Sequence, residues 1–142
     1  MAGKPSAGMN KYNVLAIYDM TETKLLMCLR AKEPYKGKLN FVGGKVEPGE
    51  SEDAAAYREL FEETGISDIE LYRVMDILYY GWDMELEVYY GVLKNEPELK
   101  EERNKLFWIS RTENFLDTDR FAGECNIEHI LRHVDLYKDK HR

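Results

Sequence analysis

Short apolar runs separated by polar turns make up much of the chain. Residues 13–19 and 24–30 are two such runs, and the polar Thr-Glu-Thr sequence between them predicts a β-hairpin. Residues 69–80 and 84–93 predict two further strands, which residues 81–83 join. The pattern therefore predicts four strands in these parts of the chain.

The segment over residues 84–93 shows a strict alternation. A period of two residues is typical of a strand whose two faces differ in polarity. We expect the face with the two glutamates to be the wetter one. The alternating sets are Glu85, Glu87 and Tyr89 on one face, and Leu86, Val88 and Tyr90 on the other.

A loop and a helix occupy the middle of the chain. Residues 51–64 predict a helix, because they are rich in alanine, leucine and glutamate. Ser51 is a good N-cap, and the two acidic residues after it favour the first helical turn. Gly65 follows at the position where helices commonly adopt a left-handed backbone. The preceding loop, residues 41–50, contains glycines that permit unusual dihedral angles.

The last third of the chain is more polar. Residues 95–105 form a predicted charged loop, and residues 106–109 a short final strand. Residues 128–138 predict a second helix with one apolar face, and Asn126 lies near its N-cap. Nearer the N-terminus, the polar residues 31–38 predict another loop. No internal repeat or domain linker interrupts these elements.

Composition limits the class of protein. The chain has 142 residues, 44% of them hydrophobic and 33% charged, which suits one domain with its own core. We expect residues 1–10 to be a flexible tail and residues 11–142 to be a single domain. The net charge of −7 argues against a nucleic-acid partner, which would need a basic face.

Two further sequence features bear on location. Apolar runs are too short to span a membrane, so we expect no membrane partner. The first ten residues lack the apolar stretch of a signal peptide. Cys28 and Cys125 are far apart and have no metal-type spacing, so reduced thiols and a cytoplasmic location are expected.

Carboxylates gather on one side of the predicted central helix. Glu59, Glu62 and Glu63 lie at positions i, i+3 and i+4, which share a helix face. Each like-charged pair costs a few tenths of a kcal/mol, and a bridging cation removes that cost. Oxygen ligands favour a hard divalent cation, Mg²⁺ first and Mn²⁺ as the alternative. Arg58 is adjacent, and a guanidinium orients carboxylates through paired hydrogen bonds.

At these residues the chain resembles the Nudix hydrolases, whose signature is G-x5-E-x7-R-E-U-x-E-E-x-G-U, with U an aliphatic residue. The signature is matched without a gap by Gly44, Glu50, Arg58, Glu59, Leu60, Glu62, Glu63, Gly65 and Ile66. The resemblance implies an α/β protein with the Nudix fold, an α/β/α sandwich around a mixed β-sheet. It also implies metal-dependent hydrolysis of a nucleoside diphosphate linked to another group, X.

The resemblance implies a role for each signature residue. Glu59, Glu62 and Glu63 would be metal ligands, and Glu63 or a more distal glutamate would activate the attacking water. Arg58 would orient the glutamates, while Glu50 would support the metal site or its loop.

Many family members supply one more metal-binding glutamate from the loop before the last strand. Glu101 and Glu102 lie in the matching loop, and we favour Glu102. The alternative for each is a solvated loop charge.

Substrate contacts are less strongly indicated. Residues 39–45 resemble the approach to the signature in the MutT-like branch, which hydrolyses oxidised purine nucleoside triphosphates. Asn40 would contact the base, since an amide both donates and accepts; the alternative is an asparagine that binds its own backbone. Arg30 and Lys45 would meet phosphates or be plain surface charges. The candidate substrate-binding residues are Arg30, Asn40, Gly43, Gly44, Lys45 and Phe121.

The segment over residues 120–126 falls where related enzymes place part of the base pocket. Phe121 would stack on a base or belong to the core. Glu124 or Asn126 would read the base, and the alternative for Asn126 is a helix cap. The aromatic side chains that would form a wall of the pocket are Tyr79, Tyr80 and Trp82.

The predicted activity is hydrolysis of a nucleoside triphosphate, including oxidised ones, to the monophosphate and pyrophosphate by water attack. Alternatives are a pyrophosphatase acting on ADP-ribose or dinucleoside polyphosphates, and a non-catalytic nucleotide-binding Nudix module. The only expected partner is a small nucleotide. The sequence leaves open whether the protein is a monomer or a homodimer.

Overall fold

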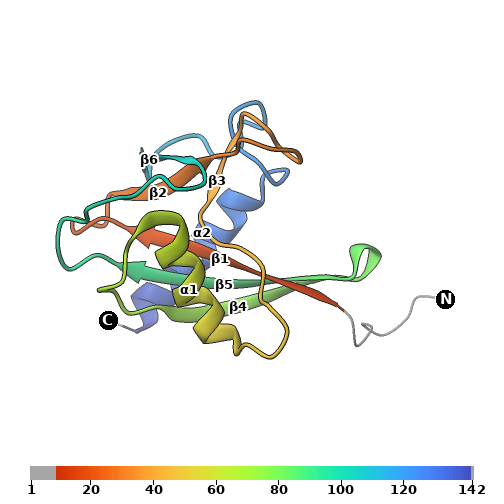
Figure 1. The fold of residues 1–142 in the computed structure, drawn as a ribbon. Coiled ribbons are helices and arrows are strands. Elements are labelled where there is room, and N and C mark those ends of the chain that lie inside the picture. The colour runs from red at the N-terminus through yellow and green to blue at the C-terminus, as the bar shows by residue number, and fades with distance from the viewer. Residues whose placement is uncertain (1–8, 142) are drawn as a thin grey trace.

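A computed structural model describes residues 9–141, and it has a mixed β-sheet between two helices (Figure 1). Helix α1 (Glu52–Thr64) covers one face of the sheet and helix α2 (Asn126–Lys140) the other. This arrangement confirms the predicted α/β/α sandwich. The six strands are β1 (Asn10–Tyr18), β2 (Lys24–Leu29), β3 (Leu39–Phe41), β4 (Tyr72–Tyr79), β5 (Met84–Val92) and β6 (Lys105–Ser110).

The sheet is built around β1. Strand β1 pairs in parallel with β5 over its whole length, from Asn10 opposite Met84 to Tyr18 opposite Val92. Strand β4 pairs antiparallel with the other edge of β5. The predicted hairpin is confirmed, because β1 and β2 are antiparallel, and β2 also pairs with β3 and β6.

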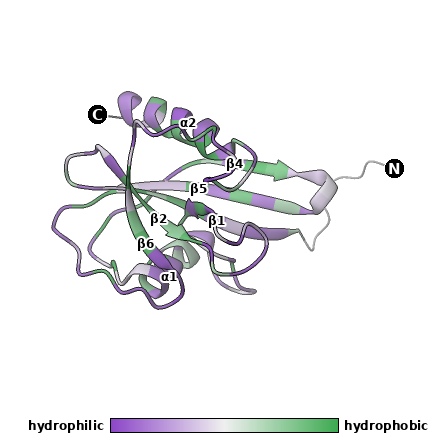
Figure 2. Cartoon of the chain, turned by 90° about the horizontal axis from the view of Figure 1, so that it is seen from above, coloured by the Kyte–Doolittle hydropathy of each residue, from purple (hydrophilic) through white to green (hydrophobic). Residues whose placement is uncertain are grey.

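Alternating residues of β1 divide the core between the two helices. Leu15 and Ile17 are fully buried in the cluster that includes α1 residues, whereas Ala16 and Tyr18 are fully buried in the cluster with α2. Figure 2 shows the strands of this sheet and the helices on its two sides coloured by hydropathy. The period of two in a strand thus places one apolar set against each helix.

Both ends of α1 lie where the sequence predicts them. The Ser51 hydroxyl accepts a hydrogen bond from the Ala54 N–H at 3.2 Å, which caps the helix. Gly65 adopts a left-handed backbone with φ of 81°, and its N–H donates to the Phe61 carbonyl at 2.9 Å. These caps fix where the signature carboxylates lie relative to the sheet.

Several predicted elements differ from those observed. Strand β3 was not predicted, because three residues are too few to show a period. Strand β4 begins at Tyr72 rather than at residue 69. Helix α2 begins at Asn126, so this residue lies inside the helix, and Cys125 occupies the N-cap position without a side-chain cap.

The prediction that the glutamate face of β5 is the more exposed one is wrong. Glu85, Glu87 and Tyr89 point to the α1 side of the sheet, where Glu87 is 0% exposed and Tyr89 is 1% exposed. The opposite set includes Val88 and Tyr90, which are also buried. Both faces of β5 are therefore covered, and alternation alone does not show which one meets water.

The ends of the chain give two further observations. Residues 1–8 of the predicted tail, which was expected to span residues 1–10, lie outside the described residues, and Asn10 already begins β1. In the part of the chain that the structure describes, neither helix has the length and apolarity needed to cross a bilayer.

Candidate active site

The loop between β3 and α1 presses against both β1 and α1. The Asn13 side-chain carbonyl accepts a hydrogen bond from the Gly44 N–H at 2.9 Å. A Cβ atom at Gly43 would lie 2.3 Å from the Asn13 carbonyl oxygen, and one at Gly44 would lie 2.3 Å from the Glu59 carboxyl carbon. Gly43 also has a φ of 142°, which side chains rarely allow. Only glycine fits at Gly43, where a side chain would meet backbone, whereas a side chain at Gly44 would displace the carboxylate of Glu59.

Arg58 links this loop to α1. Its Nε and Nη2 atoms donate to the two oxygens of Glu50, at 2.5 and 2.9 Å, in a bidentate pair. Nη2 also donates to the Lys45 carbonyl at 3.1 Å. The Arg58 hydrogen bonds are the main reason that the pKa of Glu50 is lowered to about 2. Glu50 is therefore an ionised residue that helps to fix Arg58.

Two arginines hold the outer carboxylates of the helix. Arg58 Nη1 donates to Glu59 at 2.9 Å and to Glu62 at 2.8 Å. Arg103, from the loop before β6, donates to the same two carboxylates at 2.6 and 2.7 Å. The sequence analysis missed Arg103, since one basic residue in a charged loop carries no spacing signal. Both glutamates are thus neutralised by guanidinium groups.

Glu63 lies deeper than its neighbours. It is 3% exposed and accepts a hydrogen bond from the Gly43 N–H at 3.1 Å. Burial raises the pKa of Glu63, although the Gly43 N–H opposes the rise. Cys28 of β2 lies beside it, and burial together with Glu63 raises the pKa of that thiol to about 12. Glu63 is therefore a buried carboxyl group with a raised pKa, and the Cys28 thiol beside it stays protonated.

The three signature glutamates offer the oxygen ligands that a hard divalent cation prefers. In this structure, however, Arg58 and Arg103 hold Glu59 and Glu62. Within residues 9–141, one trio of acidic, histidine or cysteine residues has all its ligand atoms within 4.8 Å of one another, and it is a different trio. The donor chemistry fits a cation, whereas the side-chain positions are those of an arginine-neutralised site.

In the loop before β6, Arg103 contacts the carboxylates of α1, whereas no such contact is seen for the two candidates for the fourth metal ligand, Glu101 and Glu102. Glu101 accepts a hydrogen bond from the Leu106 N–H at 2.7 Å, so its carboxylate is turned toward β6. Glu102 is exposed. The expectation that Glu102 completes the metal site stays a prediction.

The polar candidates for substrate contact make local contacts. Asn40 accepts a hydrogen bond from the Phe41 N–H at 2.8 Å, which is the backbone-binding alternative. The Arg30 Nε atom donates to the Pro34 carbonyl at 2.6 Å. Lys45 is exposed, and its backbone carbonyl is the Arg58 acceptor.

Phe121 lies in the core on the α2 side of the sheet. Its side chain is 1% exposed, and its ring centroid is 4.9 Å from that of Phe115. The structure thus gives Phe121 the core position that was the alternative to base stacking.

Polar side chains around residues 120–126 pair with tyrosines. The Tyr35 hydroxyl hydrogen-bonds to the Glu124 carboxylate, and Asn126 Nδ2 donates to the Tyr79 hydroxyl at 3.1 Å. Trp82 is 72% exposed and lies 5.4 Å from Tyr79 between ring centroids. Glu124 and Asn126 are therefore each engaged by a tyrosine, and a role of either in reading a base stays a prediction.

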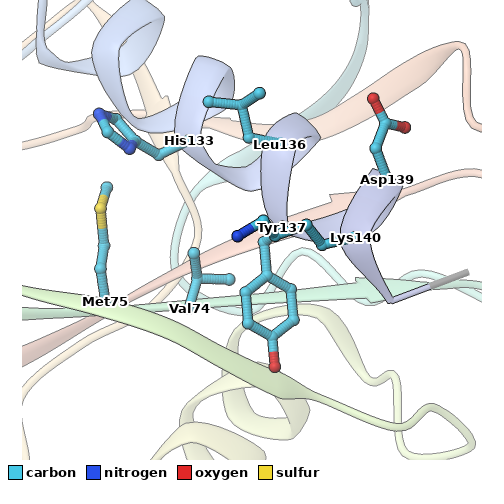
Figure 3. Close-up of a pocket in the computed structure, with 7 residues that line it drawn as sticks. All are labelled: Val74, Met75, His133, Leu136, Tyr137, Asp139 and Lys140. Carbon is cyan, nitrogen blue, oxygen red and sulfur yellow. The ribbon is translucent and has the colours of Figure 1, made fainter.

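A separate cavity of about 490 Å³ lies between β4 and α2 (Figure 3). It is on the sheet face that α2 covers, whereas the carboxylates are on α1. None of the predicted site residues lines it. Its walls are formed by Val74, Met75, His133, Leu136, Tyr137, Asp139 and Lys140.

Comparison with solved structures shows the same fold in proteins of low identity. A MutT studied from Aliivibrio salmonicida and Vibrio cholerae is 20% identical, with 89% of this chain and 98% of that chain covered and a TM-score of 0.66. The NUDIX domain of Shewanella oneidensis NrtR, complexed with ADP ribose, is 11% identical, with 93% and 90% covered and a TM-score of 0.72. A C. elegans Ap4A hydrolase is 20% identical, with 91% and 98% covered and a TM-score of 0.69.

The family assignment comes from a second comparison. No match was found among curated proteins. A family model described as the NUDIX domain matches residues 9–125, which is more than half of the chain. This match covers the glycine loop, α1 and the loop that supplies Arg103, and it confirms the resemblance seen in the signature. The chain therefore belongs to the Nudix hydrolase family.

Proposed function

We propose that this protein is a Mg²⁺-dependent pyrophosphohydrolase of nucleoside triphosphates, including oxidised ones, that releases the monophosphate and pyrophosphate. The observation that carries the proposal is the simultaneous contact of Arg58 with Glu50, Glu59 and Glu62. One guanidinium thereby sets the orientation of the glycine loop and of two candidate metal ligands. The gap-free signature is folded into one site, as catalysis requires.

Glu59, Glu62 and Glu63 would hold the cation. A divalent cation supplies charge to neutralise pyrophosphate oxygens and lowers the pKa of bound water. Arg103 has to leave Glu59 and Glu62 for both carboxylates to become ligands, and its guanidinium is then available for a phosphate. Mn²⁺ has similar ligand preferences and is expected to substitute for Mg²⁺.

Glu63 is the proposed proton acceptor. Its pKa is raised toward neutral pH, and a general base is most effective when its pKa lies near the pH of the reaction. The Gly43 N–H donates to it at 3.1 Å and so helps to fix its orientation. Proton transfer from the attacking water to Glu63 would generate the nucleophile for the phosphoanhydride.

The proposed substrate class rests on the resemblance of residues 39–45 to the MutT-like branch and on the fold shared with a MutT protein. Structural neighbours complexed with ADP ribose or named as an Ap4A hydrolase make those substrates the second candidates. The complete signature argues against a module that only binds nucleotides. Two free cysteines support the proposal of a cytoplasmic enzyme.

A panel of nucleotides with separate detection of pyrophosphate and phosphate tests this proposal. The panel contains canonical and oxidised nucleoside triphosphates, ADP-ribose and dinucleoside polyphosphates, each with Mg²⁺. We expect pyrophosphate release from triphosphates, and loss of turnover in Glu62→Gln with the fold intact. Binding of a nucleotide without turnover on any member of the panel would refute the catalytic proposal.

A further inference from the structure

We propose a second divalent-cation site, formed by Glu52, Glu85 and Glu87 at the N-terminal end of α1. The site does not depend on the proposed catalytic function. Glu52 is in the first turn of α1, and Glu85 and Glu87 are alternate residues of β5 that point to the same face of the sheet. Glu59 lies seven positions after Glu52, so about 10 Å of helix separates this site from the signature carboxylates.

The three carboxylates are close enough to bind one ion. Each offers an oxygen within 4.8 Å of the others. Hard divalent cations bind oxygen at about 2.1–2.5 Å, so oxygens on opposite sides of one ion lie about 4.2–5 Å apart. The spacing of the trio thus fits a single cation, which would displace Lys11 or Arg73 from the Glu52 oxygens that they contact at 3.3 and 2.6 Å.

The burial of Glu87 is a second, independent observation that points to a bound cation. Glu87 is 0% exposed, and as an ionised carboxylate it has no hydrogen-bond donor for either oxygen. Its ion pair with Arg73 Nη2 is long, at 3.8 Å, because that nitrogen donates to Glu52 at 2.6 Å and to Asp76 at 2.9 Å. Burying a carboxylate without a hydrogen-bond donor is costly, and a cation among the trio would remove that cost.

The balance of charge at this place fits a divalent ion. The acidic groups that meet here are Glu52, Glu85, Glu87 and Asp76, and the basic groups are Lys11 and Arg73. Two negative charges remain unbalanced when all six groups are ionised. The adjacent Asp53 is engaged separately by the Tyr89 hydroxyl at 2.7 Å.

Without the cation, a proton takes its place. Burial first, and then the neighbouring Glu52 and Glu85, raise the pKa of Glu87 to about 9. Hydrogen bonding to Glu87, Arg73 and Lys11 lowers the pKa of Glu52 to about 2.

The position of the site suggests what it does. Asn13 lies opposite Glu87 in the β1–β5 register, and its side-chain carbonyl holds the Gly44 N–H of the active-site loop. A cation bound to Glu52, Glu85 and Glu87 would fasten the start of α1 to β5 beside Asn13. It would therefore stiffen the frame that carries the catalytic loop.

A Mg²⁺ titration followed by amide chemical shifts in NMR spectra of the full chain tests the proposal, because a diamagnetic ion shifts mainly the signals of residues beside it. We expect two sets of shifted signals, one around residues 58–64 and one around residues 84–88. Glu87→Gln should weaken the apparent Mg²⁺ affinity read from the second set at least about tenfold and leave that of the first unchanged. Glu96→Gln, at an exposed loop position, is the matched control with the same change of charge.

Two results would overturn the site. The signals of residues 84–88 would not shift at Mg²⁺ concentrations that saturate the first set, which would mean that Glu87 binds a proton and no cation. Alternatively, their shifts would persist with the same affinity in Glu87→Gln, which would mean diffuse attraction to an acidic surface. Glutamine keeps the shape of a protonated glutamate, and the metal-free spectrum checks that the variant is folded.

Discussion

The buried carboxyl of Glu87 makes a quantitative prediction about stability and pH in the absence of metal. Its pKa is about 9 in the folded protein, against an ordinary value of 4.5. Between these two pH values the folded state holds one proton more than the unfolded state at this group. The free energy of unfolding must then fall by about 1.4 kcal/mol for each unit that the pH rises. Relative to pH 4.5, the free energy of unfolding at pH 7 is then lower by about 3 kcal/mol.

Glu87→Gln removes this titration while keeping a neutral side chain that can donate to Glu52. The variant is therefore expected to be more stable than wild type at pH 7, with about 3 kcal/mol as an upper limit, since Glu52 can rearrange to relieve part of the cost. The difference should shrink toward zero as the pH falls to about 4.5, because Glu87 is then protonated in both states.

Urea denaturation of both proteins with a chelator, at several pH values between about 5 and 8.5, measures this difference. All other titrating groups are shared, so subtracting the two curves isolates position 87. A difference that grows with pH supports the reasoning. The reasoning would be refuted if the free energy of unfolding changed with pH equally in the two proteins, or if Glu87→Gln were the less stable protein at pH 8.

Three further predictions concern the active site. Glu63→Gln should lower kcat by about 10²–10⁴-fold with the fold kept, and the wild-type rate should fall at acidic pH as Glu63 takes up a proton; steady-state assays over pH check both. Gly44→Ala should displace Glu59 and destabilise the protein by about 1–3 kcal/mol, which denaturation measures; an unchanged variant would contradict the close contact. Arg103→Gln should bind Mn²⁺ several-fold more tightly than wild type without substrate, as titration calorimetry would show, because the competing guanidinium is gone; weaker binding would mean that Arg103 does not compete.

Local sequence signals were sufficient to predict helix α1. Ser51 and Gly65 mark its ends through capping chemistry, which acts over a few residues. The spacing of Arg58 from its glutamates fixes their contacts in the same way. The family match over residues 9–125 agrees with what these residues predict.

The parts that could not be predicted depend on contacts between distant segments. Asn13 reaches Gly44 because of the register between strands, and Arg103 reaches Glu59 across 44 positions of sequence. The same register buries Glu87, although its alternation with apolar residues suggested a wet face. Periodicity shows that a strand has two faces, but packing decides what covers each one.

The most direct test of the central claim is Mg²⁺-dependent hydrolysis measured side by side in wild type and Glu62→Gln. The account predicts that wild type converts a nucleoside triphosphate to the monophosphate and pyrophosphate, and that chelation of the metal abolishes the reaction. It also predicts that Glu62→Gln loses this turnover while keeping its fold. Unimpaired turnover in Glu62→Gln would contradict the assignment of the carboxylates on α1 as the catalytic metal site.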